Sequence, residues 1–314
     1  MPYNRGSQSS DDGGSWSEHA RMKISRPICR RLGIAILAVV WLFSVACSSI
    51  MSSATGSLAD SLTTAVLDQN DPETVRQGAP AYLLMIDGFI ADNPRNLDLL
   101  LAGANLYSSY AGTFVDDPER AVKLAEKGRD YGWRALCRSD QRACDVWSAP
   151  YEDFERVVDG FGAKRVPVLY GSGAAWATWI QKNTGDWKAI ADKARVDAMM
   201  QRVVALDETY SDGAAYLYLG ILATLMPEAM GGKPEKGRAD FERAIELSDG
   251  RNLMAKVLLA EKYARLVFDR DLHDRLCREV LDADPAADGL TLINTVAQEE
   301  ARKLLESSED YFGD

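Results

Sequence analysis

The sequence predicts an all-α protein made of tetratricopeptide-like helix pairs that stack into a solenoid or superhelix. Apolar residues return every three or four positions over most of the chain after residue 57, which is the spacing of one helix face. No run alternates apolar and polar residues with the period of two that a half-buried strand shows. The same succession of turn, helix, short loop and second helix recurs along the chain, as in stacked helix repeats.

The first clear helix pair is expected over residues 97–112 and 118–136. Pro-Arg-Asn at 94–96 precedes the first helix. Asp117 stands where an N-cap is expected, and Pro118 falls in the first turn of the second helix. Both residue types favour a helix start at these positions.

Later copies follow the same pattern. Helix pairs are expected over 214–226 with 234–248, and over 253–268 with 271–285. Gly213 and Asn252, which open two of these pairs, lie 39 positions apart, and Asn96 lies three such intervals before Gly213. A period of this size is typical of tetratricopeptide or HEAT repeats.

Residues 133–207 should hold degenerate copies, with 166–182 and 193–210 as one helix pair. One pair cannot bury its apolar face alone, so neighbouring pairs must stack, and stacking curves the array into a concave surface. Helical-repeat folds of this kind bind other molecules more often than they catalyse reactions.

Residues 1–46 are predicted to be a signal peptide, with Met22 as the expected true start. Arg30 and Arg31 precede an apolar run over 32–45, which is shorter than the about 20 residues that a membrane span needs. The junction Ala46-Cys47 resembles the lipobox of bacterial lipoproteins, although Ser44 stands where that motif usually has Leu. An uncleaved anchor and a plain secretory signal are the alternatives.

Cys47 is therefore the predicted lipidation site, and it would become the first residue of the mature chain. Residues 47–57 form a small, polar tether, and residues 58–314 form the helical-repeat domain. Ser48 after the cysteine resembles the outer-membrane sorting pattern. We expect a periplasmic protein that a lipid anchors to the inner leaflet of the outer membrane.

Composition argues against several function classes. The chain has 36 basic and 47 acidic residues and a net charge of −11, whereas nucleic-acid binding needs clustered cations. His273 is the only histidine after the leader, which excludes a multi-histidine metal site. We expect it on a helix surface or against a partner face. No catalytic residue, metal or cofactor is predicted, and the chain is not expected to be an enzyme.

The remaining cysteines divide into a pair and a single residue. Cys137 and Cys144 are close in sequence, and an exported protein meets an oxidising compartment, so we expect a disulfide between them. Cys277 is expected to be a small buried side chain of a helix.

The densest aromatic stretch lies in residues 170–179. Trp176 and Trp179 are one turn apart on the expected helix, and Tyr170 precedes them. These three residues are the candidates to line a ligand site or pore, because indole rings offer apolar area and a polar N–H. The alternative is ordinary core packing, which is the more frequent use of aromatic residues at this spacing.

Several segments of the second half carry a family resemblance. They are PEAMGGKPEKG at 227–237, FERAIELS at 241–248, NLMAKVLLAEKY at 252–263, NTVAQEEARKLL at 294–305 and Asp-Tyr-Phe at 310–312. The combination resembles the T component of tripartite ATP-independent periplasmic (TRAP) transporters, and the likeness extends from about Ser57 to the end.

The resemblance implies a lipoprotein of tetratricopeptide-like helix pairs that forms a homotrimer with a pore through each subunit. It implies a periplasmic solute-binding protein as the partner, and an accessory role in moving a small, apolar ligand. The family has no catalytic residue, so none is carried over.

Two other functions compete with this one. A generic tetratricopeptide lipoprotein would organise envelope proteins by gripping peptide segments, and an open polar groove rather than a closed apolar pore would favour it. A helical hydrolase would need a carboxylate pair in a cleft. The pairs at 116–117 and 299–300 are instead explained by helix capping and a solvated helix face.

Overall fold

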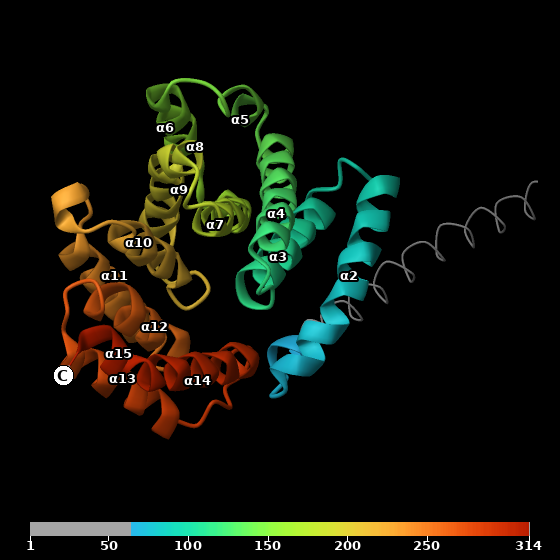
Figure 1. Ribbon diagram of the computed structural model, residues 1–314. Coiled ribbons are helices and arrows are strands. Elements are labelled where there is room, and N and C mark those ends of the chain that lie inside the picture. Colours follow the sequence, from blue (N-terminus) through green and yellow to red (C-terminus); the bar gives the residue numbers. More distant parts are fainter. Residues whose placement is uncertain (1–63, 314) are drawn as a thin grey trace, which may run out of the picture. The chain divides into compact units, whose positions relative to one another are not determined.

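The computed structural model describes residues 64–313, and residues 62–314 form one compact unit. Every regular element of the described residues is helical, which confirms the predicted all-α class (Figure 1). The predicted leader, Cys47 and the tether lie outside the described residues. No helix among residues 64–313 is long and apolar enough to cross a membrane.

The helices follow one another with short connections. They are α2 (Pro72–Asp92), α3 (Leu97–Thr113), α4 (Pro118–Ser139), α5 (Gln141–Asp145), α6 (Tyr151–Asp159), α7 (Val166–Lys182), α8 (Trp187–Ala191), α9 (Lys193–Leu206), α10 (Ala214–Thr224), α11 (Pro234–Leu247), α12 (Leu253–Leu258), α13 (Arg270–Asp282), α14 (Thr291–Glu306) and α15 (Ser308–Phe312). Helix α12 continues as a π-helical segment, Leu259–Ala264.

Helix starts follow the capping chemistry that the sequence predicts. The Asp117 carboxylate accepts a hydrogen bond of 2.7 Å from the backbone N–H of Arg120, and Pro118 occupies the first turn of α4. Asn96 caps α3 in the same way through the N–H of Leu99. These contacts satisfy backbone donors that a helix start leaves free, so the predicted starts of the first helix pair are confirmed. The two helices end at Thr113 and Ser139, slightly beyond the predicted ends.

Glycines allow helices to approach closely. A Cβ at Gly132 of α4 would lie 3.0 Å from the Cα of Ser172 in α7, and the Ser172 hydroxyl donates to the Gly132 carbonyl at 2.7 Å. A Cβ at Gly220 of α10 would lie 2.6 Å from the ring of Phe241 in α11. Both glycines stand where two packed helices leave no room for a side chain.

The Met-Gly-Gly turn at 230–232 has a backbone reason for its composition. Gly231 has a φ of 87°, which favours glycine, and a Cβ at Gly232 would lie 1.6 Å from the carbonyl oxygen of Met226. The turn is fixed to the end of α10 by a backbone hydrogen bond of 2.8 Å, in which the Lys233 N–H donates to the Ala223 carbonyl. Helix α11 begins at the next residue. This motif of the predicted family resemblance is thus a structural turn.

Most helices pack on helices that are near in sequence, such as α3 on α4, α4 on α7, α7 on α9 and α10 on α11. This succession is compatible with the predicted solenoid. The array also closes on itself, because α14 contacts α2 (Figure 1) and the Gly289 N–H donates to the Asp68 carboxylate at 2.6 Å. Asp68 and Gly289 are 221 positions apart.

Candidate functional site

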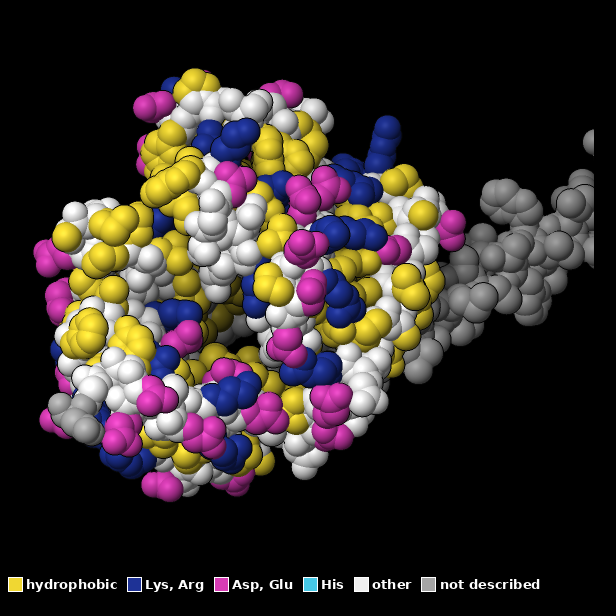
Figure 2. All heavy atoms as spheres, viewed as in Figure 1, with side chains coloured by type: hydrophobic (Ala, Val, Ile, Leu, Met, Phe, Trp, Pro, Cys, Tyr) yellow, Lys and Arg dark blue, Asp and Glu magenta, His cyan; other side chains and the backbone are white. Residues whose placement is uncertain are grey.

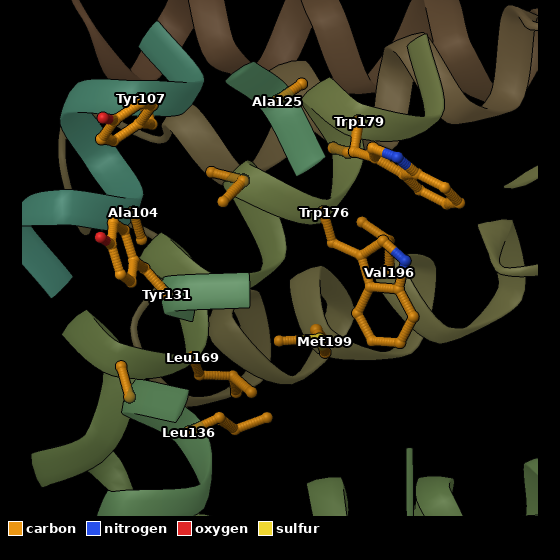
Figure 3. Close-up of a cluster of buried hydrophobic side chains, with 14 of the residues drawn as sticks. Ala104, Tyr107, Ala125, Tyr131, Leu136, Leu169, Trp176, Trp179, Val196 and Met199 are labelled. Atoms are coloured by element: carbon orange, nitrogen blue, oxygen red, sulfur yellow. The ribbon is translucent and has the colours of Figure 1, made fainter. Parts of the chain in front are cut away.

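The predicted aromatic residues of α7 belong to a larger cluster. The Trp176 ring stacks on Trp147 with centroids 4.3 Å apart and meets the Phe154 ring edge-on at 6.0 Å. Trp147 in turn lies 4.5 Å from Trp133 of α4. Trp176 and Trp179 are only 2% and 7% exposed, and Figure 3 shows them with Val196 and Met199 among the buried side chains.

Two charged groups complete this cluster. The Arg129 guanidinium lies 3.7 Å from the centroid of the Trp179 ring and 5.3 Å from that of Trp147. The Trp176 indole N–H donates to Asp192 at 3.2 Å. We name the residues Trp133, Trp147, Trp176, Trp179, Arg129 and Asp192 the tryptophan–arginine cluster.

One charged member of the cluster, Arg129, has an unpartnered buried donor. The Nε atoms of Arg129 and of the neighbouring Arg195 are buried and find no hydrogen-bond partner among the described residues. Burial lowers the pKa of Arg129 and raises the pKa of Asp192 from their ordinary values. Buried donors without partners are costly, so this cluster has hydrogen-bonding capacity that a carboxylate or hydroxyl group could use.

Tyr170 lies apart from the tryptophans. Its ring packs edge-on against Tyr210 at 5.3 Å and Tyr218 at 6.0 Å. Burial raises the pKa of Tyr170 well above its usual value, so the phenol stays neutral. The sequence thus singled out three residues that the structure distributes between two aromatic groups, and the role of all three in lining a ligand site stays a prediction.

The sequence did not reveal the other members of the tryptophan–arginine cluster. Trp133 and Arg129 come from α4, Trp147 from the connection between α5 and α6, and Asp192 from the start of α9. In the sequence, each of these residues is a single arginine, tryptophan or aspartate on an ordinary helix face or in a loop, and nothing there relates it to Trp176. Three-dimensional packing brings them to Trp176.

A second polar cluster lies at the end of α7. Lys182 is half-buried, and its pKa is lowered mainly by burial and to a smaller extent by the positive charge of Lys262. The carboxylates of Asp116, Glu261 and Glu300 act on this pKa in the opposite direction. These neighbours come from the α3–α4 connection, the π-helical segment and α14. Figure 2 shows the surface hollowed between α14 and the α3–α4 connection, with charged side chains nearby.

Cys137 and Cys144 are joined as a disulfide in the structure, with Cα atoms 4.5 Å apart. The bridge ties the last turn of α4 to α5, close to the loop that carries Trp147. Its formation in the exported protein stays a prediction. Cys277 is buried, as expected, and burial raises the pKa of its thiol to about 12.

His273 is a core residue, so the expectation that it lies on a helix surface was wrong. Its side chain is fully buried, and its ring centroid lies 5.1 Å from that of Phe312. Its Nδ1 lies 2.9 Å from the carboxylate of Asp274. The cause is α15, which folds over α13 and was not predicted as a helix. No group of three or more potential metal ligands gathers among residues 64–313.

Two comparisons with known proteins bear on the family of this chain. The profile of the TRAP transporter T-component family matches residues 68–312. An uncharacterized protein of Treponema pallidum (strain Nichols) is 25% identical over 267 residues, which cover 79% of this chain and 82% of that protein. Because the family profile spans nearly all of the described residues, the chain belongs to the TRAP transporter T-component family.

Proposed function

We propose that this protein is a non-enzymatic accessory component of a TRAP-type periplasmic solute uptake system. In this proposal it binds a periplasmic solute-binding protein and passes a small, apolar ligand through a pore in each subunit of a homotrimer. The family match over residues 68–312 carries the proposal. The closure of the helical array between α2 and α14 supports it, because a closed array can surround a passage.

Within this proposal, Trp176, Trp179 and Tyr170 line the ligand route. Their burial means that a ligand reaches the indoles only when neighbouring side chains move. The unpartnered Nε of Arg129, beside two indole rings, suits a ligand that has an apolar body and one carboxylate. The charged groups around Lys182 would face the hollow at the other end of α7.

The proposed location is the periplasm, with a lipid on Cys47 that anchors the chain to the outer membrane. Metabolic labelling with a radioactive fatty acid should mark the wild-type protein and leave Cys47→Ala unmarked. Equal labelling of both proteins would refute lipidation at this position.

Titration of the purified protein with the solute-binding protein of the TRAP system from the same organism tests the partner. We expect a saturable complex in analytical ultracentrifugation, with three protein subunits in each assembly. No complex at any concentration, with a solute-binding protein that binds its own solute normally, would contradict the proposal. Equal binding to unrelated envelope proteins would favour the general scaffold instead.

A further inference from the structure

The C-terminal half of α2 exposes an apolar strip. Leu84, Met85 and Phe89 are 74%, 45% and 48% exposed, whereas Leu83 and Ile86 on the opposite face are buried. Met85 and Phe89 are four positions apart and share one helix face, and Leu84 borders that face. Every exposed residue between positions 78 and 89 is uncharged. This strip, which we name the α2 strip, therefore presents large apolar side chains with no partner among the described residues.

A basic concavity lies beyond the end of the same helix. It has a volume of about 510 Å³, and Arg95, Arg138, Lys164 and Arg165 contribute to its wall, with Asp98 as its acidic residue. Arg165 pairs with Asp140. No carboxylate of residues 64–313 lies within salt-bridge distance of Arg95, Arg138 or Lys164. Because the whole chain has a net charge of −11, this local excess of cations runs against the charge of the protein.

The strip and the concavity adjoin at the turn between α2 and α3. Phe89 precedes Arg95 by six positions, and α2 ends at Asp92. The turn is held against α4, because Arg134 donates to the Pro94 carbonyl at 3.2 Å and Arg138 donates to the Arg95 carbonyl at 3.1 Å. The apolar strip and the cationic concavity are therefore neighbours along the chain, on the two sides of a turn that is fixed to α4.

We propose that this region binds the surface of an anionic phospholipid membrane. The basic concavity receives the phosphate of a headgroup, and the α2 strip contacts the boundary between headgroups and acyl chains. An exposed apolar helix face with neighbouring cations has the composition of surfaces that lie on membranes. The concavity also includes the first turn of the 17-residue α3, where backbone N–H groups add to the attraction for phosphate.

The position of the region in the chain fits this occupant. Cys47, the predicted lipid site, precedes Pro72 by 25 positions, which can span up to about 80 Å when extended. A lipid at the end of a tether of this length leaves the orientation of the domain free, and a second contact is needed to fix it. The region would supply that contact and hold the domain in one orientation. The inference goes beyond the transport role and does not depend on it.

Vesicle flotation of a protein limited to residues 62–314, which form a compact unit by themselves, tests the proposal without the lipid. We expect flotation with vesicles that contain phosphatidylglycerol, weak flotation with pure phosphatidylcholine, and loss of binding in high salt. The double variant Arg138→Glu and Lys164→Glu should bind at least tenfold more weakly, because each cation near an anionic surface contributes about fivefold. Leu84→Ser with Phe89→Ser should also weaken binding.

Matched variants control for charge and for exposed apolar area. Arg156→Glu with Arg275→Glu makes the same change of charge at side chains that are 75% and 64% exposed elsewhere, and should float as the wild type does. Met230→Ser removes another exposed apolar side chain, and it should be equally neutral. Circular dichroism verifies that each variant is folded.

Four outcomes would overturn the proposal. The first is a wild-type protein that does not float with anionic vesicles, and the second is a variant of Arg138 and Lys164 that floats as well as the wild type. The third is binding of inorganic phosphate to the concavity in calorimetry without vesicle binding, which would assign the concavity to a small anion. The fourth is self-association of the wild-type protein that Leu84→Ser with Phe89→Ser abolishes, again without vesicle binding. This result would assign the α2 strip to a second copy of the chain.

Discussion

At the scale of single residues, Trp176 is held from several sides. Trp147 stacks on its ring, Phe154 meets it edge-on and Asp192 accepts its indole N–H. Trp176→Ala should lower the free energy of unfolding by about 3–5 kcal/mol, because it vacates a well-packed volume. Chemical denaturation measures the loss. Trp187→Ala is the control, since Trp187 is 76% exposed, and its effect should stay within about 0.5 kcal/mol.

A different result would change the role of this residue. If Trp176→Ala kept nearly the stability of the wild type, the packing of the indole would contribute little to the core. If the folded variant bound the solute-binding protein and supported solute transport normally, the residue would serve the core alone, and its proposed place in the ligand route would be wrong.

Asp87 links three helices and should make stability depend on pH. Its carboxylate accepts from Lys127 at 2.5 Å, Tyr131 at 2.6 Å and Tyr107 at 2.7 Å. Burial alone would raise its pKa, but the hydrogen bonds from Lys127 and the two tyrosines outweigh burial and lower it. The charged form therefore stabilises the fold above the unfolded pKa of about 3.9, and this contribution is lost as the pH falls through the lower folded pKa.

Asp87→Asn should cost about 1–3 kcal/mol near neutral pH, because it weakens a charge-assisted network. The difference from the wild type should shrink at about pH 3, below the unfolded pKa, because there the unfolded chain takes up a proton that the folded carboxylate resists. Urea denaturation at the two pH values measures both effects. Asp92→Asn, an exposed carboxylate of the same helix, is the control; an equal loss there, or a difference that does not depend on pH, would argue against this role of Asp87.

At the scale of helices, the close approach of α4 and α7 depends on Gly132. Gly132→Ala should cost about 1–3 kcal/mol, since its Cβ would meet the backbone of α7 at Ser172. Gly78→Ala provides the contrast, because a Cβ there meets nothing within 4 Å inside α2, and it should stabilise by about 0.5–1 kcal/mol. Thermal unfolding compares the two variants. A harmless Gly132→Ala would show that the helices can separate at little cost.

Helix periodicity and capping predicted the elements well, because both depend on residues that are close in sequence. The Asp117 cap and the helices over 97–112, 166–182 and 234–248 appear where expected, within a few residues. The short helices α5, α8 and α15 were not predicted, since five residues are too few to show a period. The π-helical continuation of α12 has the same apolar spacing as an ordinary helix.

At the scale of the whole molecule, the long-range contacts escaped prediction. The hydrogen bond between Asp68 and Gly289 joins positions that no repeat pattern relates, and the tryptophan–arginine cluster combines side chains from four segments. The order of the helices along the chain does not indicate which side chains meet across the array. The sequence pattern therefore predicts the helices and their succession, while the contents of the candidate site follow from tertiary packing.

Solute uptake by intact cells tests the central claim, that this protein serves a TRAP transport system. Accumulation of the radiolabelled TRAP solute is compared in the parent strain, a strain without the gene, and that strain carrying the gene again. We expect accumulation to fall in the deletion strain and to return with the wild-type gene, while the amount of the solute-binding protein stays constant. Unchanged uptake in the deletion strain, under conditions where uptake requires the solute-binding protein, would contradict the account.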